Sequence, residues 1–257
     1  MCSTADSFNP KRKYLLFSSV DSRRSAHSSW LDAPGRAFDV VLYAYGGESL
    51  EGVADLFVKN KGYKFQNFHV FSGICDVSQY SAVWVVDDDI EMGTADINKM
   101  FDLFVMHDLY LAQPSYDSGS YTIWDMAVVD ERYRLRYTNF VENGVTVFSG
   151  NALKKCLPVM KDIETGCGSD YIFPFLLDFP KNKIAIFDEK VTKDWNKRRA
   201  CGFDDWKTGL FRDVVKEGSK SIACTSDLGG VLRSFDIMKF GKNTLQVGIK
   251  SKLNEDG

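Results

Sequence analysis

The stretch that decides the fold is Ser81-Ala-Val-Trp-Val-Val-Asp87-Asp88-Asp89-Ile90-Glu91. Its first half is apolar and rich in β-branched residues, which is typical of a strand buried on both faces of a sheet. The strand leads directly into three carboxylates at positions 87 to 89. In an open α/β sheet, ligands bind just beyond the carboxyl ends of the strands. The stretch therefore predicts an α/β sheet with an acidic ligand site at the end of one strand.

The three carboxylates call for a compensating charge. Adjacent carboxylates repel by about 1 kcal/mol per pair at about 4 Å in water, and by about 4 kcal/mol at the effective dielectric constant of a protein surface. Such repulsion either raises a pKa or attracts a cation. Side chains alternate along a strand, so Asp87 and Asp89 point to one side and Asp88 to the other. Mg²⁺ takes one or two carboxylates plus substrate phosphates, so Asp87 and Asp89 are the predicted metal and nucleotide pair. The alternative is an acidic turn that N-caps the next helix.

The bulk properties fit a soluble globular protein. The chain has 257 residues, 44% hydrophobic and 26% charged, which is ordinary composition for such a protein. This length suits one large α/β domain or two small ones. No repeat or linker is visible, so we expect one domain over 1–257, with residues 1–12 frayed. The net charge of −3 offers no basic field for a phosphate backbone, and we expect no nucleic-acid partner.

The cysteines and the termini indicate a reducing compartment. The six cysteines lie far apart and show no CxxC spacing, which argues against a zinc site and against a disulfide framework. We expect buried free thiols. No signal peptide is visible at the N-terminus, and no apolar run approaches the ~20 residues that span a bilayer. The expected location is cytoplasmic, with no membrane span.

Hydrophobic periodicity predicts alternating elements in the first half of the chain and a strand-rich second half. We expect strands over 13–19, 38–45, 68–71, 81–86, 111–114, 121–129, 133–140, 142–149 and 183–188. We expect helices over 48–59, 94–109, 150–161 and 194–217. This order fits a nucleotide-binding sheet extended by an acceptor-binding half.

A set of phrases resembles a bacterial and plant glycosyltransferase-like family, long catalogued as a domain of unknown function, whose members look like GT-A-type enzymes. The resemblance spans about residues 14 to 195 in one order. The matching phrases are Ser25-Ala-His27-Ser-Ser-Trp30-Leu31, Phe38-Asp39 to Tyr45-Gly46, Tyr80 to Asp89, Leu111-Ala-Gln113-Pro114-Ser115, Arg136-Tyr137-Thr138-Asn139-Phe140-Val141-Glu142, Val147-Phe148-Ser149, Gly168-Ser169-Asp170 and Ile184-Ala-Ile-Phe-Asp188.

This resemblance implies a GT-A-like, Rossmann-type fold with a mixed, mostly parallel sheet. It makes the acidic triplet a DxD motif for a nucleotide-diphosphate sugar and for Mn²⁺ or Mg²⁺. Asp89 would bind the cation, and Asp87 would contact ribose or water in the metal shell. Further donor contacts are expected from Ser19, Val20, Asp21, Arg24, His27 and Asp88. For His27, packing or capping is the alternative to a substrate contact.

The resemblance also implies residues for the sugar and acceptor. Gln113 and Glu142 would face the sugar and acceptor cleft, although Glu142 can equally pair with a nearby arginine. Asp170 takes the place of the general base of inverting members. The alternative is a structural role for Asp170 as a helix N-cap, since Gly168-Ser169-Asp170 precedes an apolar segment.

The chain departs from the family pattern at two points. Family members usually carry Gly-Trp-Gly-Leu-Asp where this chain has Gly166-Cys-Gly-Ser-Asp170. The loss of the tryptophan suggests a changed sugar or acceptor surface. A histidine metal ligand is also replaced here by Asp194, which can still bind Mg²⁺ or Mn²⁺. The basic run that begins at Lys197 is either a solvated surface or a counter-charge for the departing diphosphate.

These observations predict a metal-dependent transferase that moves a sugar from a nucleotide-diphosphate sugar to a glycan or other hydroxyl acceptor, with inversion. Two alternatives stay open. One is another metal-dependent nucleotide enzyme, such as a nucleotidyltransferase. Such an enzyme needs a basic phosphate-binding loop after the first strand, and Arg23-Arg24 would be a minimal version of that loop. The other is a non-catalytic sugar- or partner-binding module on the same scaffold.

Overall fold

The computed structural model describes residues 7–24, 26–47, 49–120, 124–164, 166, 168–189 and, as backbone, 190–194 and 247–250. Its strands are β1 (Tyr14–Asp21), β2 (Phe38–Gly46), β3 (Leu56–Lys59), β4 (Ala82–Asp87), β5 (Ile90–Glu91), β6 (Leu111–Tyr116), β7 (Tyr133–Tyr137), β8 (Val145–Phe148), β9 (Ile184–Asp194) and β10 (Val247–Lys250). Its helices are α1 (Ala26–Ser29), α2 (Lys64–Ser72), α3 (Thr94–Met106), α4 (Gly150–Met160) and α5 (Ser169–Leu176), with short 3₁₀ turns η1 (Val77–Gln79) and η2 (Asp125–Ala127).

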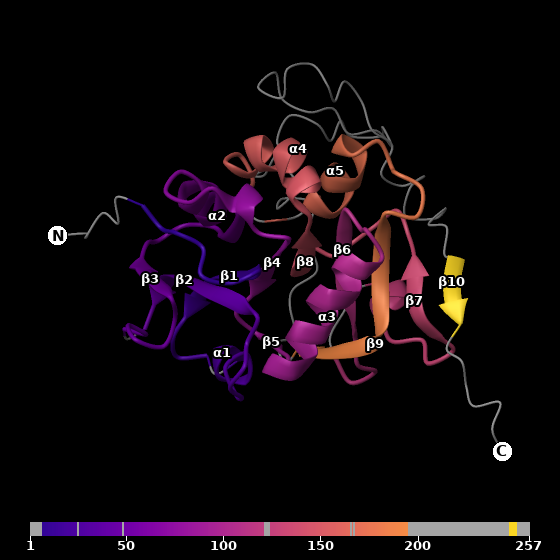
Figure 1. Ribbon diagram of the computed structural model, residues 1–257, viewed down its shortest axis with the longest axis horizontal. Coiled ribbons are helices and arrows are strands. Elements are labelled where there is room, and N and C mark those ends of the chain that lie inside the picture. The colour runs from indigo at the N-terminus through magenta and orange to yellow at the C-terminus, as the bar shows by residue number, and fades with distance from the viewer. Residues whose placement is uncertain are drawn as a thin grey trace, which may run out of the picture.

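One sheet runs through the described residues in the order β3-β2-β1-β4-β8-β6-β9-β7-β10 (Figure 1). β1 pairs in parallel with β2 and β4, and β2 pairs in parallel with β3. β8 lies antiparallel between β4 and β6, and β9 is parallel to β6. β7 and β10 extend the sheet antiparallel to their neighbours. Along this path, β7 and β8 run against the direction shared by the other strands, which confirms the expected mixed, mostly parallel sheet.

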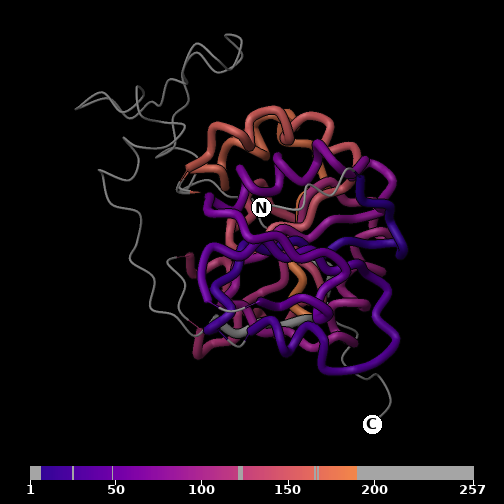
Figure 2. Tube along the Cα trace, turned by 90° about the vertical axis from the view of Figure 1, so that its left-hand side faces the viewer, coloured from indigo at the N-terminus to yellow at the C-terminus, as the bar shows by residue number. Residues whose placement is uncertain are grey.

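Two apolar clusters cover opposite faces of this sheet. Along β1, Leu15 and Phe17 join the cluster that includes α2, α4 and α5, whereas Tyr14 and Leu16 join the cluster that includes α3. This alternation is the period of two that a strand buried on both faces requires. Figure 2 shows α4 and α5, in salmon and orange, above the sheet. Each fully buried Phe or Leu contributes about 1.5–3 kcal/mol, so these clusters fix the strands that carry the site.

The helix predicted over 48–59 and the strand predicted over 68–71 are both wrong. The segment predicted as a helix over 48–59 consists, in its described part, of turns followed by β3. Gly52 has a φ of 82°, a left-handed conformation that interrupts a helix. The predicted strand over 68–71 belongs to α2, because Phe65, Phe68 and Phe71 are buried at three-residue spacing, which is a helical repeat.

Most of the other predicted strands and helices are found in the structure. Strands and helices appear close to the positions predicted for β1, β2, β4, β6, β7, β8, β9, α3 and α4. The described part of 121–129 forms η2 instead of a strand. Residue 194 ends β9, and the rest of the helix expected over 194–217 lies outside the described residues.

Cys75 and Cys156 are buried free thiols, as expected. In the part of the chain that the structure describes, no helix is long and apolar enough to cross a membrane.

The carboxyl ends of β1, β2 and β4 meet at one end of the sheet. Ser19 of β1 lies opposite Asp87 of β4, and Asp21 lies opposite Gly46 of β2. Gly47 follows with a φ of 80°, and a Cβ atom there would clash with Ser22 Oγ and lie 3.0 Å from the Ser22 nitrogen. Glycine at this position therefore allows the loops after β1 and β2 to approach each other beside the acidic triplet.

Candidate functional site

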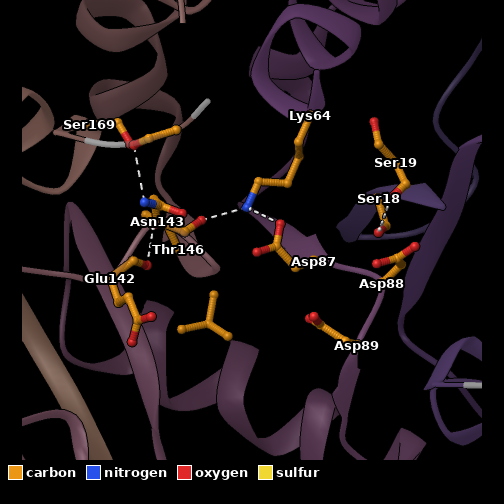
Figure 3. Close-up of polar contacts among 12 residues, drawn as sticks. Ser18, Ser19, Lys64, Asp87, Asp88, Asp89, Glu142, Asn143, Thr146 and Ser169 are labelled. Atoms are coloured by element: carbon orange, nitrogen blue, oxygen red, sulfur yellow. Dashed lines mark hydrogen bonds and ion pairs between the residues drawn. The ribbon is translucent and has the colours of Figure 1, made fainter. Parts of the chain in front are cut away.

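The acidic triplet lies at the end of β4, as the sequence predicts. Figure 3 shows the carboxylates of Asp87 and Asp89 on the side of Glu142, and that of Asp88 on the side of Ser19. The alternation expected of a strand is therefore kept beyond its end. The three carboxylates have different partners, and these partners give each a different chemistry.

Asp88 anchors the loops after β1 and β2. Its Oδ2 accepts a hydrogen bond from the Asp21 nitrogen at 2.7 Å and another from the Tyr45 hydroxyl at 2.8 Å. Burial raises the pKa of Asp88, and these hydrogen bonds and the charge of Arg24 only partly oppose that rise. Asp88 thus holds the β1 and β2 ends against β4.

Asp89 is paired with the Arg24 guanidinium, and the residue after it lies in a short strand, β5, that pairs with the end of β9. Arg24 Nη1 lies 3.3 Å from Asp89 Oδ2 and 3.6 Å from Asp88 Oδ1. In β5, the backbone of Ile90 pairs with that of Asp194 at the end of β9. The antiparallel pairing therefore brings Asp194 to within one residue of Asp89 along the strand, although the two are far apart in the sequence.

Asp89 offers carboxylate oxygens, the donors that Mn²⁺ and Mg²⁺ take, whereas only the backbone of Asp194 is described. Within the described residues, no three Asp, Glu, His or Cys side chains gather into a metal-binding group. A cation that takes one or two carboxylates and completes its shell with substrate phosphates and water needs no such group. Arg24 is the group that such a cation would displace from Asp89, because both would occupy the same carboxylate.

Asp87 is paired with Lys64, the first residue of α2. Lys64 Nζ lies 2.7 Å from Asp87 Oδ1 and donates a hydrogen bond to the Asn143 carbonyl at 2.6 Å (Figure 3). The Lys64 side chain is only 11% exposed. Because a buried ammonium requires such partners, this ion pair fixes the amino end of α2 against the end of β4.

A cleft of about 700 Å³ opens beside this ion pair. It lies between the carboxyl ends of β1, β2 and β4 and the loop that leads into α2. Its lining residues are Ser19, Tyr45, Lys61, Gly62, Tyr63, Lys64, Phe65, Gln66, Asp87, Asp88, Asn143, Glu164 and Gly166. Tyr45 and Tyr63 are 41% and 50% exposed, so the cleft presents aromatic surface together with charges of both signs.

Asp170 is a buried carboxyl at the start of α5. Gly168, with a φ of 88°, is the N-cap of that helix, so the alternative that Asp170 caps it is wrong. Asp170 Oδ1 accepts a hydrogen bond from the Asn143 nitrogen at 2.7 Å. Burial raises the pKa of Asp170 to about 7, although Asn143 and the charge of Lys64 act in the opposite direction. A carboxyl of this kind changes its protonation near neutral pH, as a general base requires.

The segment 142–144 joins the site residues through its main chain. The Glu142 nitrogen donates to Gln113 Oε1 at 2.6 Å, and the Asp87 nitrogen donates to the Gly144 carbonyl at 2.9 Å. Asn143 contacts Lys64 and Asp170, as described above. Gln113 is fully buried and therefore supports this segment instead of facing a cleft. Glu142 itself is partly exposed.

The other predicted donor residues lie around the end of β1 with unequal access. Ser19 lines the cleft and accepts a hydrogen bond from Asn67 Nδ2 at 2.9 Å. Val20 is fully buried in the cluster that includes α3, so its side chain does not reach the cleft. Arg23 lowers the pKa of Asp21 to about 2 through a charge-assisted hydrogen bond. His27 lies partly exposed in α1, and the predicted Lys197 lies outside the described residues.

The sequence prediction missed Lys64, Tyr45 and Asn143 as site residues. Lys64 begins α2, in a segment for which no element is predicted from the sequence. The three-residue spacing of the phenylalanines after it could have revealed that helix. Asn143 acts through its main chain and, by its side chain, donates to the Gly166 carbonyl at 3.0 Å, and no motif signals such contacts.

No protein-family model matches the chain, and no curated protein matches it. A crystal structure of GalNAc-T7 with UDP, GalNAc and Mn²⁺ matches with a TM-score of 0.53 at 7% identity, over 74% of this chain and 45% of that chain. The crystal structure of S. aureus TarS 1-349 matches with a TM-score of 0.49 at 12% identity, over 70% of this chain and 59% of that chain. The chain thus spans less than two thirds of these structures.

The comparison establishes the fold. The sheet order, its flanking helices and the match to GalNAc-T7 confirm the predicted GT-A-like, Rossmann-type fold. At this low identity the likeness reaches no further than the fold. The resemblance to the family of unknown function stays a prediction carried by the sequence phrases.

Proposed function

We propose that this chain transfers a sugar from a nucleotide-diphosphate sugar to a hydroxyl acceptor, with inversion at the anomeric carbon and with Mn²⁺ or Mg²⁺. The observation that carries this proposal is a chain of contacts that joins a carboxylate of the cleft to a buried carboxyl behind it. Asp87 of the acidic triplet lines the cleft, and the buried Asp170 is joined to it through Asn143 and Lys64. We assign Asp87 to the donor side of the site and Asp170 to the role of the base.

The cleft suits a nucleotide-sugar donor in size and chemistry. Ligand pockets commonly measure about 300–1,000 Å³, and this cleft of about 700 Å³ lies within that range. Tyr45 and Tyr63 offer faces for a base or a sugar ring, and Lys61 offers positive charge for a diphosphate. The GalNAc-T7 crystal structure, which shares the fold, contains UDP, GalNAc and Mn²⁺, and this supports a donor of that class.

The metal would be held by Asp89 and Asp194. When bound, such a cation supplies positive charge that stabilises the departing diphosphate. Arg24, released from Asp89, would be free to donate hydrogen bonds to a phosphate oxygen, a geometry for which guanidinium groups are well suited. Asp88 keeps the loops after β1 and β2 in place, through its contacts with Asp21 and Tyr45.

Asp170 would act as the general base. Its carboxylate accepts the proton of the acceptor hydroxyl while that oxygen bonds to the anomeric carbon from the face opposite the diphosphate. The bond between the anomeric carbon and the diphosphate oxygen breaks with its electron pair on the diphosphate. The raised pKa of Asp170, about 7, makes it a stronger base than an ordinary carboxylate and still allows it to ionise near neutral pH. Glu142 is the next candidate for this role.

Thermal unfolding with nucleotide diphosphates tests this proposal. A ligand that binds only the folded state stabilises it by about 2.7 kcal/mol at a hundredfold excess over Kd. We expect nucleotide diphosphates to raise the melting temperature with Mn²⁺ or Mg²⁺ and not with EDTA. Equal shifts in Mn²⁺ and in EDTA would refute the metal requirement. The absence of a shift with every nucleotide diphosphate and every nucleotide sugar would refute the function.

A further inference from the structure

Lys64 contacts the Asp87 carboxylate directly and is linked to the Asp170 carboxyl through Asn143. The two carboxyls have separate roles in the proposed reaction. Lys64 Nζ contacts Asp87 Oδ1 at 2.7 Å, on the donor side of the site. The same atom donates to the Asn143 carbonyl at 2.6 Å, and the Asn143 nitrogen donates to Asp170 Oδ1 at 2.7 Å. One ammonium group thus holds the residue whose main chain holds the proposed base.

The position of Lys64 is fixed by its surroundings. The side chain is 11% exposed, and its Nζ lies 4.9 Å from the centre of the Phe65 ring. A lysine ammonium has three N–H donors and a mobile stem. Contacts with a carboxylate, a carbonyl and an aromatic ring confine that stem to one arrangement, so the ammonium keeps a constant place relative to Asn143.

We propose that Lys64 is a positioning residue for the base: it fixes Asn143 so that the main-chain N–H stays on Asp170. This inference rests on the proposed function in so far as it assigns Asp170 as the base. The contacts that carry it come from α2, β4 and the segment 142–144.

The charged and titratable groups around Asp170 set the expected direction. Lys64 approaches from α2, and its charge lowers the pKa of Asp170 against the stronger effect of burial. Tyr171 follows on the same helix, and burial, with the Asp170 charge, raises the pKa of that hydroxyl. The other acidic residues of this region are Glu142, the chain neighbour of Asn143, and Glu164, which lines the cleft. Lys64 is therefore the counter-charge whose removal makes Asp170 harder to ionise.

Titration of Asp170 through protein stability tests this inference without any substrate. The free energy of unfolding is measured against pH for wild type and for Asp170→Asn, and the difference between the two curves gives the midpoint for Asp170. The same pair is measured in the Lys64→Met, Lys64→Arg and Asp87→Asn backgrounds. Met keeps the length of the side chain without its charge, Arg keeps the charge, and Asp87→Asn removes the carboxylate partner while leaving the ammonium.

We expect Lys64→Met to move the Asp170 midpoint upward by about one pH unit, the effect of losing a nearby positive charge. Lys64→Arg should leave the midpoint close to that of wild type. Asp87→Asn should leave it unchanged or lower it, because the ammonium loses a negative neighbour. An unchanged midpoint in Lys64→Met would overturn the inference. An equal upward movement in Asp87→Asn would do the same, since it would indicate general loosening of the site.

Turnover separates this inference from the proposed function. If wild type transfers sugar, the pH at which kcat rises should move upward in Lys64→Met by the same interval as the titration midpoint. A movement of about one unit from about 7 should lower kcat at about pH 7 by about fivefold. A rise that stays in place in that variant contradicts the positioning role. Movement of the titration midpoint in a protein that turns over no nucleotide sugar supports the role of Lys64 and refutes the transferase.

Discussion

Asp170 should reduce the stability of the folded protein at the pH where it is proposed to work. The structure raises the pKa of this carboxyl from 3.8 to about 7. Because each pKa unit corresponds to about 1.36 kcal/mol, ionising Asp170 in the folded state costs about 4 kcal/mol more than in the unfolded chain. Asn at this position has the same size and keeps an oxygen for the Asn143 nitrogen, and it carries no charge. Asp170→Asn should therefore be the more stable protein wherever Asp170 of the unfolded chain is ionised.

The direction of the pH dependence follows from proton binding in the two states. Below the unfolded pKa of 3.8, both states are protonated and the Asp170 contribution to stability is complete. As pH rises toward 7, the unfolded chain releases the proton and the folded protein retains it, so stability falls. Above about pH 7 both states are ionised and the loss is constant. Relative to wild type, Asp170→Asn should thus gain stability between about pH 4 and pH 7 and keep that gain.

Urea unfolding of both proteins from about pH 4 to pH 8 measures this difference, since groups common to both proteins cancel. We expect a difference near zero at the acidic end and a gain of about 2–4 kcal/mol at the basic end, the lower value allowing for local relaxation around the ionised carboxyl. At the basic end the variant should also lose turnover by about 10²–10⁴-fold. A stability difference that does not change with pH, or a variant that is less stable at about pH 8, would refute the reasoning from burial.

Three further substitutions test other parts of the structure. Asp89→Asn should abolish the Mn²⁺ dependence of nucleotide-diphosphate binding in calorimetry and leave the melting temperature nearly unchanged, and undiminished Mn²⁺-dependent affinity would contradict the assignment of Asp89. Gly47→Ala should destabilise the protein by about 1–3 kcal/mol, because its φ of 80° and the crowding by Ser22 are both unfavourable for a Cβ atom; unfolding at the wild-type urea midpoint would show that the loop relaxes. Arg136→Met should cost about 3–5 kcal/mol in urea unfolding, because it leaves Asp188, held at 2.6 Å, as an uncompensated buried charge, and a cost below about 1 kcal/mol would show that water reaches Asp188.

The sequence predicts the acidic triplet and its setting because both are local. A β-branched run followed by Asp87, Asp88 and Asp89 specifies a buried strand, its end and the alternation of its side chains. The buried strands of the central sheet are predictable for the same reason, since they are short apolar runs with clear ends. The helix α3 is equally local, because its apolar residues recur at helical spacing.

The sequence does not predict features that depend on distant pairing. The segment 56–59 becomes β3 because it lies along the edge of β2, and this tertiary pairing overrides a helical spacing. Asp170 owes its raised pKa to burial by elements far apart in the chain, and Lys64 owes its role to a main-chain carbonyl 79 residues away. Such contacts arise only when the sheet is assembled.

The measurement that tests the central claim most directly is sugar transfer itself. The full chain is incubated with a panel of nucleotide-diphosphate sugars and hydroxyl acceptors in the presence of Mn²⁺ or of EDTA, and the release of nucleotide diphosphate and the anomeric configuration of the product are measured. We expect acceptor-dependent release with Mn²⁺, a product of inverted configuration, and a loss of at least about a hundredfold in Asp170→Asn. A product of retained configuration, or full turnover in Asp170→Asn, would contradict the assignment of the base. Absence of transfer from every donor would contradict the transferase.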